Sequence, residues 1–197
     1  MDLMDLGLYL RPDDLDVNGN PVDPGLAGLY NMAMAPETIT EVVFHPETGK
    51  ISHRGTFKQD WAFNLQLSAM DWSTEGMSQP TLHHVTYQGC RPGNISQRAA
   101  KLYSDRIDLD LLREDTPGSL CSFERPSMEL KSRWEYPDLS DHITSPAFAP
   151  RGAAPGSYSG GEPGGHDGYV IQPVCNDDGF RVEVFDAAKV GAGPIAT

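Results

Sequence analysis

Glycine and proline occur along the whole chain, and their distribution is the feature that most constrains the fold. The 197 residues include 20 glycines and 16 prolines, which divide the apolar residues into short groups. Long helices need uninterrupted stretches, because proline breaks a helix and glycine weakens one. Short strands joined by turns tolerate this punctuation. The pattern therefore predicts an all-β fold with long loops.

The clearest strand signal is a hairpin near the C-terminal end. Residues 168–173 and 180–186 are rich in β-branched and aromatic side chains, and the second segment alternates apolar with charged residues. Between them lies Asp178-Gly179, a pair typical of tight β-turns. These features predict two antiparallel strands.

Three further elements follow from local pattern. Residues 38–44 and 51–57 flank a glycine-containing turn, which predicts a second hairpin. Residues 81–87 are rich in β-branched and aromatic side chains, so we expect another strand there. Residues 97–103 are good helix formers that follow Ser96, a favourable N-cap, and this combination predicts one short helix.

Three other segments have patterns of their own. Residues 61–67 carry an aromatic or leucine side chain at every second position, which indicates a half-buried strand. Residues 105–110 alternate acidic and apolar side chains but lack the glycine and final glutamate of a calcium loop, so we expect an exposed edge strand. Residues 151–168 are rich in glycine, alanine, proline and serine, which favours a flexible loop.

Charge and cysteine content limit the classes of partner and compartment. The formal charge is −13, from 28 acidic and 15 basic residues, so nucleic acids and anionic membranes would be repelled. The three cysteines form no CxxC pair, and a reducing cytoplasm is the simplest interpretation. Neither a secretion signal nor a run of about 18 apolar residues is present, so we expect no transmembrane helix.

Five short motifs occur in a particular order along the chain. The first is Leu-His-His-Val-Thr-Tyr at residues 82–87, and the second is Pro-Ala-Phe-Ala-Pro-Arg at residues 146–151. Then come His-Asp-Gly-Tyr-Val at 166–170, Val-Phe-Asp-Ala at 184–187 and Gly-Pro-Ile-Ala at 193–196. In this order the motifs resemble the C-terminal part of the carotenoid cleavage oxygenase family.

The resemblance spans residues 38–197 and is poorest over 96–140. It implies that residues 1–197 are the C-terminal portion of a seven-bladed β-propeller. Four histidines near the propeller axis hold Fe(II) in this family, and glutamates orient some of them. The iron uses O2 to cleave a carbon–carbon double bond of a carotenoid, apocarotenoid or stilbene-like substrate into two carbonyl products. His83 occupies the position of one iron ligand and is our candidate metal-binding residue.

The chain departs from the family pattern at two points. Ser145 stands where the family has a glutamate, and a serine cannot orient an imidazole as a carboxylate does. The family's last histidine ligand would follow Thr197, and its first two would precede the matching segment. We therefore expect the iron site to be incomplete in this chain.

The other histidines have simpler interpretations. In a strand, His83 and His84 point to opposite faces, so both cannot face one metal. Without the resemblance, both would be interpreted as strand histidines bonded to the backbone. His45 matches a second family segment weakly, and we favour an exposed turn residue; His166 is expected in a loop.

A second class of function remains open. The alternative is a catalytically inactive β-rich module or remnant that binds an apolar ligand or a partner protein. An isolated part of a propeller would expose strand edges and apolar faces, so we expect it to self-associate when expressed alone.

Overall fold

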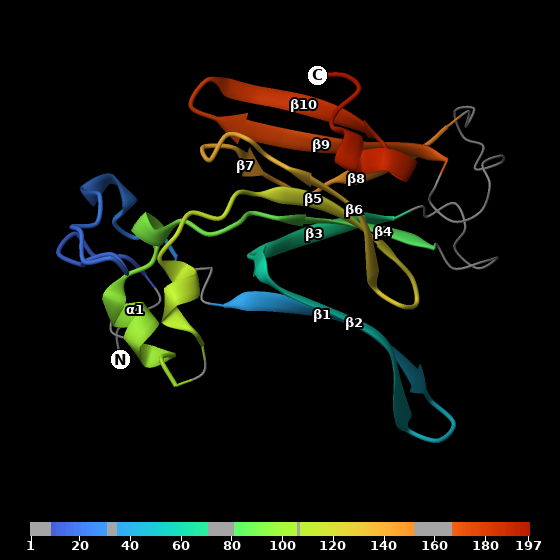
Figure 1. Ribbon diagram of the computed structural model, residues 1–197, viewed down its shortest axis with the longest axis horizontal. Coiled ribbons are helices and arrows are strands. Elements are labelled where there is room, and N and C mark those ends of the chain that lie inside the picture. Colours follow the sequence, from blue (N-terminus) through green and yellow to red (C-terminus); the bar gives the residue numbers. More distant parts are fainter. Residues whose placement is uncertain (1–8, 31–34, 71–80, 106, 152–166) are drawn as a thin grey trace. The chain divides into compact units, whose positions relative to one another are not determined.

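The structure, a computed structural model, describes residues 9–30, 35–70, 81–105, 107–151 and 167–197 (Figure 1). Strands predominate in this part of the chain, every strand pair is antiparallel, and none of the sheets closes on itself. The all-β prediction is confirmed at this level. His166 and nearly all of the loop predicted at 151–168 lie outside the described residues.

The strands within the described ranges are β1 (Pro36–His45), β2 (Lys50–Phe63), β3 (Leu65–Met70), β4 (Leu82–Tyr87), β5 (Ser119–Glu124), β6 (Glu129–Glu135), β7 (His142–Ile143), β8 (Ala147–Pro150), β9 (Gly168–Asn176) and β10 (Gly179–Asp186). The helical segments there are the α-helix α1 (Gln97–Leu102) and the 3-10 turns η2 (Pro24–Leu26), η4 (Pro92–Asn94), η5 (Leu109–Leu112) and η6 (Ala187–Ala192). No helix in the described ranges is long and apolar enough to cross a membrane.

The chain divides into two compact units. The first comprises residues 1–37, 59–64 and 89–117. Its core is a cluster of apolar side chains contributed by loops, helical segments and the end of β2: Val17, Phe63, Cys90, Ile95, Ala100 and Leu112. The predicted helix is confirmed as α1, whose Ala99 N donates to the Ser96 hydroxyl at 3.2 Å. The edge strand predicted at 105–110 is wrong, because η5 begins at Leu109 with Asp108 as its cap.

The second unit comprises residues 38–58, 65–88 and 118–197. It contains two four-stranded sheets, one in the order β3-β4-β5-β6 and one in which β10 and the pair β7/β8 flank β9 (Figure 1). Apolar side chains from both sheets and the turns that follow them form its core: Leu120, Tyr136, Ile143, Val170, Val174, Phe185, Ala187 and Val190.

The predicted C-terminal hairpin is confirmed as β9 and β10, which pair from Gly179↔Asn176 to Asp186↔Tyr169. The side chains that face the core are not all those that hydropathy alone favours. Phe180 is 70% exposed, whereas the Glu183 residue is only 5% exposed. Arg181 and Glu183 therefore share the core face of β10 with Phe185.

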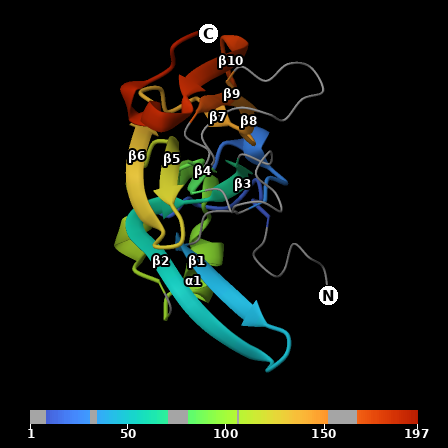
Figure 2. The same ribbon diagram turned by 90° about the vertical axis from the view of Figure 1, so that its right-hand side faces the viewer.

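The predicted hairpin at 38–57 is confirmed as β1 and β2, a two-stranded sheet whose distal part belongs to the second unit. A Cβ atom at Gly55 would lie 2.2 Å from Ser127 O, so β2 meets the β5–β6 turn backbone to backbone. Phe57 packs edge-on against Phe123 of β5, with ring centroids 4.6 Å apart. Figure 2 shows this long hairpin extending away beyond the turn that joins β5 and β6.

The strand predicted over residues 61–67 is interrupted. Asn64 has a φ of 59° and separates the end of β2 from the start of β3. This left-handed conformation is one that asparagine adopts more readily than most residues. The alternating side chains on its two sides therefore belong to two strands.

Candidate functional site

The two adjacent histidines of β4 point to opposite faces of the β3–β6 sheet, as alternation in a strand requires. In the pairing of β4 with β5, His83 lies opposite Phe123 and His84 lies opposite Ser122. His83 thus shares a face with the phenylalanine that packs against β2 of the long hairpin. His84 faces the other way, toward β8.

His84 is held by its surroundings. It is fully buried, and its Nδ1 and the Ser122 hydroxyl are hydrogen-bonded at 2.8 Å. Its ring is stacked on Phe148 of β8, with centroids 6.1 Å apart and planes 8° from parallel. These contacts fix the orientation of the imidazole within the core of the second unit.

His83 has a different environment. Its Nε2 is buried and has no hydrogen-bond partner among the described residues. Burial is the main cause that lowers the pKa of His83 below its ordinary value of 6.5; the positive charge of Arg125 adds to this, and the negative charge of Glu41 opposes it. The imidazole is therefore neutral at neutral pH, the form in which histidine binds a metal ion.

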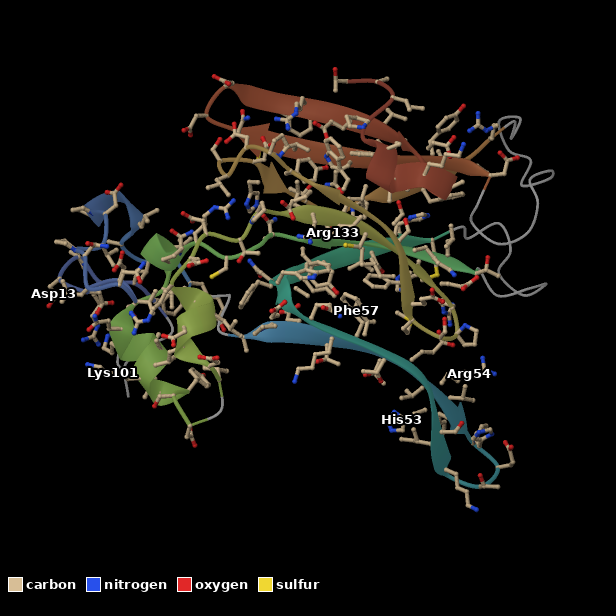
Figure 3. The ribbon with its side chains drawn as sticks, in the orientation of Figure 1. Asp13, His53, Arg54, Phe57, Lys101 and Arg133 are labelled. Atoms are coloured by element: carbon tan, nitrogen blue, oxygen red, sulfur yellow. The ribbon has the colours of Figure 1, made fainter. Side chains whose placement is uncertain are left out.

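The carboxylate near His83 is already paired. Glu41 of β1, whose side chain is 9% exposed, accepts a hydrogen bond from Arg125 Nε at 2.6 Å. Arg54 Nη1 of β2 lies 3.6 Å from the other carboxylate oxygen. Figure 3 shows Arg54 and Phe57 along β2, with Phe57 between that strand and the sheet. This ion pair anchors the long hairpin, and nothing in the sequence pattern identified Glu41 as a partner.

The C-terminal motifs of the resemblance meet around one arginine. Arg151, at the end of the 146–151 motif, donates from Nε to Asp167 at 2.9 Å and from Nη1 to the Tyr169 hydroxyl at 3.0 Å. Its guanidinium carbon lies 4.6 Å from the centre of the Tyr169 ring. Its Nη2 lies 3.4 Å from Asp186, in the 184–187 motif. Three segments far apart in sequence are thus held together.

A second contact links the same motifs through a glycine. A Cβ atom at Gly168 would lie 2.4 Å from Phe148 Cζ and 2.6 Å from Ala149 O. Only glycine leaves room here for β8, which pairs with β9 at this point. Because Phe148 also stacks on His84, the 146–151 motif contacts the 82–87 motif as well. Gly193, with φ +89°, packs in the same close manner on Trp134.

The remaining candidates have ordinary surface environments. The His45 Nε2 and Ser52 Oγ atoms lie 3.2 Å apart beside the β1–β2 turn, in line with its interpretation as a turn residue. Ser145 is exposed just before β8. Across the described ranges, no group of three or more histidine, cysteine, aspartate or glutamate side chains is placed to hold a metal ion. The chain matches no known protein-family model, and no curated protein matches it.

Proposed function

We propose that this chain is the C-terminal portion of an Fe(II)-dependent oxygenase of the carotenoid cleavage type, with His83 as one of its iron ligands. The observation that carries the proposal is the environment of His83. Its Nε2 is buried, lacks a partner among the described residues and belongs to an imidazole that burial keeps neutral. Buried polar groups are nearly always bonded, so an unbonded imidazole nitrogen favours a ligand.

The way in which the motifs interlock supports the same proposal. Arg151 joins the 146–151, 166–170 and 184–187 segments, and Phe148 joins the first of these to β4. The segments that resemble the family therefore pack against one another. Two four-stranded antiparallel sheets in succession are also what neighbouring blades of a seven-bladed propeller would provide.

The described residues do not form an iron site by themselves. They offer the His83 imidazole, and the carboxylate that acts on it, Glu41, is paired with arginines. Further ligands have to come from outside the described part of the protein. When bound, Fe(II) would supply O2 activation for cleavage of a double bond in an apolar conjugated substrate. The contribution of this chain is a neutral, oriented imidazole nitrogen.

Iron binding at equilibrium tests the proposal. Because the family's other histidine ligands are expected outside this chain, we expect weak binding of Fe(II) at His83. Oxygen-free equilibrium dialysis against Fe(II) would measure bound iron in the wild type, in His83→Ala and in the His53→Ala control, whose histidine is exposed on β2. We expect His83→Ala to bind less iron than the other two proteins. Equal binding by all three proteins would refute the role of His83.

A second function is favoured by two observations. The absence of a three-ligand group in the described ranges, together with serine at position 145, fits a β-rich module that binds an apolar ligand or a partner protein without iron. This second function would be indicated by a chain that folds cooperatively, binds no iron and has the same free energy of unfolding with or without Fe(II).

A further inference from the structure

The distal part of the β1–β2 hairpin extends away from the sheet to which the hairpin is attached. The attachment runs through Glu41, Gly55 and Phe57, which contact β5 or the turn that follows it. Residues 42–54, which we call the arm, continue past these contacts as two strands and a turn (Figure 2). A two-stranded sheet is only marginally stable in water unless another surface covers it. The arm therefore has the form of an element that packs on a partner.

The arm also exposes apolar side chains. Phe44 is 60% exposed, Ile51 is 63% exposed and Val42 is 49% exposed. Val42 and Phe44 lie two positions apart in β1, so they point to the same face. A group of exposed apolar side chains on a projecting element is typical of a protein interface.

A second exposed apolar surface lies on the β9–β10 sheet. Phe180 is 70% exposed and Val182 is 38% exposed, and both point to the outer face of β10. Ile195 is 59% exposed, and its backbone N donates to Val184 O of β10 at 2.7 Å. We call Phe180, Val182 and Ile195 the β10 patch. Within the described ranges, the four most exposed large apolar side chains all belong to the arm or to the β10 patch.

The charged residues of β10 leave its outer face apolar. Arg181 donates to both oxygens of Asp141, at 2.8 and 2.7 Å, and to Glu183 at 2.8 Å. These bonds hold the arginine and the glutamate on the core face. An antiparallel sheet with one face in water normally has the opposite pattern, with its polar side chains outside. The outer face of β10 is therefore arranged like a face that another surface covers.

Charge favours a second copy of this chain as the partner of the arm. The arm carries two basic side chains and one acidic side chain, whereas the other residues carry 13 basic and 27 acidic side chains. Lys50 is exposed at the arm's turn, and Asp177 and Asp178 are exposed at the turn before Phe180. Nucleic acids and anionic membranes would be repelled by so acidic a chain. A second copy offers the arm both an apolar surface and an acidic turn.

We propose that two copies form a symmetric dimer in which the arm of each copy packs on the β10 patch of the other. The arm and β10 lie on opposite sides of the β3–β6 sheet, so the arm does not cover the patch of its own chain (Figures 1 and 2). In a two-fold dimer each contact occurs twice, and both copies have their exposed surfaces covered. The dimer involves neither His83 nor the proposed function.

Sedimentation velocity of the full chain over a wide range of concentration tests the dimer. We expect a reversible monomer–dimer equilibrium. Phe44→Ser and Phe180→Ser should each raise the dissociation constant about tenfold or more, because each removes an apolar contact twice per dimer. Leu102→Ser is the matched control, since Leu102 is 55% exposed on α1, and it should leave the constant unchanged. A chain that stays monomeric throughout, or a dimer that Phe180→Ser does not weaken, would overturn the proposal.

A charge exchange tests which surfaces meet. Asp177→Lys reduces the net negative charge, so it would strengthen a dimer limited by general repulsion. Our proposal predicts that it weakens the dimer, because the new lysine meets Lys50. Lys50→Glu should also weaken the dimer, and the double variant Lys50→Glu/Asp177→Lys should restore it. Asp13→Lys makes the same change of charge at an exposed position of the first unit and should not weaken the dimer. Equal strengthening by Asp177→Lys and Asp13→Lys would overturn the proposed contact.

An anionic membrane is the alternative partner of a basic and apolar arm. The wild-type chain would be sedimented with vesicles of phosphatidylserine and phosphatidylcholine. We expect the chain to stay in the supernatant. Binding to these vesicles that Phe44→Ser abolishes would replace the second copy with a membrane and overturn the proposal.

Discussion

Replacement of Gly168 by alanine should disrupt the unit into which the C-terminal motifs pack. The new Cβ atom would lie 2.4 Å from Phe148 Cζ and 2.6 Å from Ala149 O, whereas ordinary contacts begin at 3.4 Å. One partner is a ring stacked on His84, and the other is the backbone of β8. Neither can withdraw by the required ~1 Å without disturbing the β8–β9 pairing.

We expect Gly168→Ala to lower the free energy of unfolding by about 1–3 kcal/mol, the usual cost of overpacking a core. For a chain of this length each kcal/mol corresponds to about 2–4 °C in the melting temperature. The assay is thermal and urea unfolding followed by circular dichroism. Gly93→Ala is the matched control, because a Cβ there would have no neighbour within 4 Å.

A compensating substitution makes the test sharper. Phe148→Leu removes the ring that the new methyl group meets, so the double variant Gly168→Ala/Phe148→Leu should lose less stability than the two single effects added together. Equal melting temperatures for Gly168→Ala and Gly93→Ala, or strictly additive losses in the double variant, would refute the packing argument.

Three other predictions concern buried charge and buried sulfur. Asp141→Ala should destabilise the chain by about 2–3 kcal/mol in urea unfolding, less than a fully buried pair because the Arg181 side chain is 32% exposed; an unchanged midpoint would contradict this. Because the pKa of His83 is lowered from 6.5 in the folded state, the unfolded state binds more protons just below pH 6.5, so stability should fall there as the pH falls. Melting temperatures of the metal-free protein between pH 5 and 7.5 should show this slope in the wild type but not in His83→Gln. In the native chain a thiol reagent should modify Cys175 before Cys121, since burial raises the pKa of Cys121 to about 12; equal rates would show that the core opens.

Elements whose signals are local could be predicted from the sequence. The β9–β10 hairpin follows from Asp178-Gly179, and α1 follows from the Ser96 cap. The opposite directions of His83 and His84 follow from alternation alone. Each of these predictions depends on residues within one short segment, so no distant contact was able to override it.

Features set by distant partners could not be predicted. Hydropathy favours Phe180 in the core, yet it is exposed because Arg181 and Glu183 turn inward toward Asp141, some forty positions earlier in the chain. The Glu41–Arg125 pair likewise joins segments that only the fold brings together. The propeller, the iron and the substrate stay predictions, since a single imidazole in the described residues tests none of them.

The most direct test of the proposed iron site asks whether an imidazole nitrogen is bound to iron. The Fe(II)-loaded chain would be treated with nitric oxide and studied by electron spin echo spectroscopy, which detects the nitrogen of a coordinated histidine. Our account predicts an imidazole signal in the wild type and in His53→Ala that is lost in His83→Ala. An iron signal without imidazole nitrogen, or one that is unchanged in His83→Ala, would contradict it.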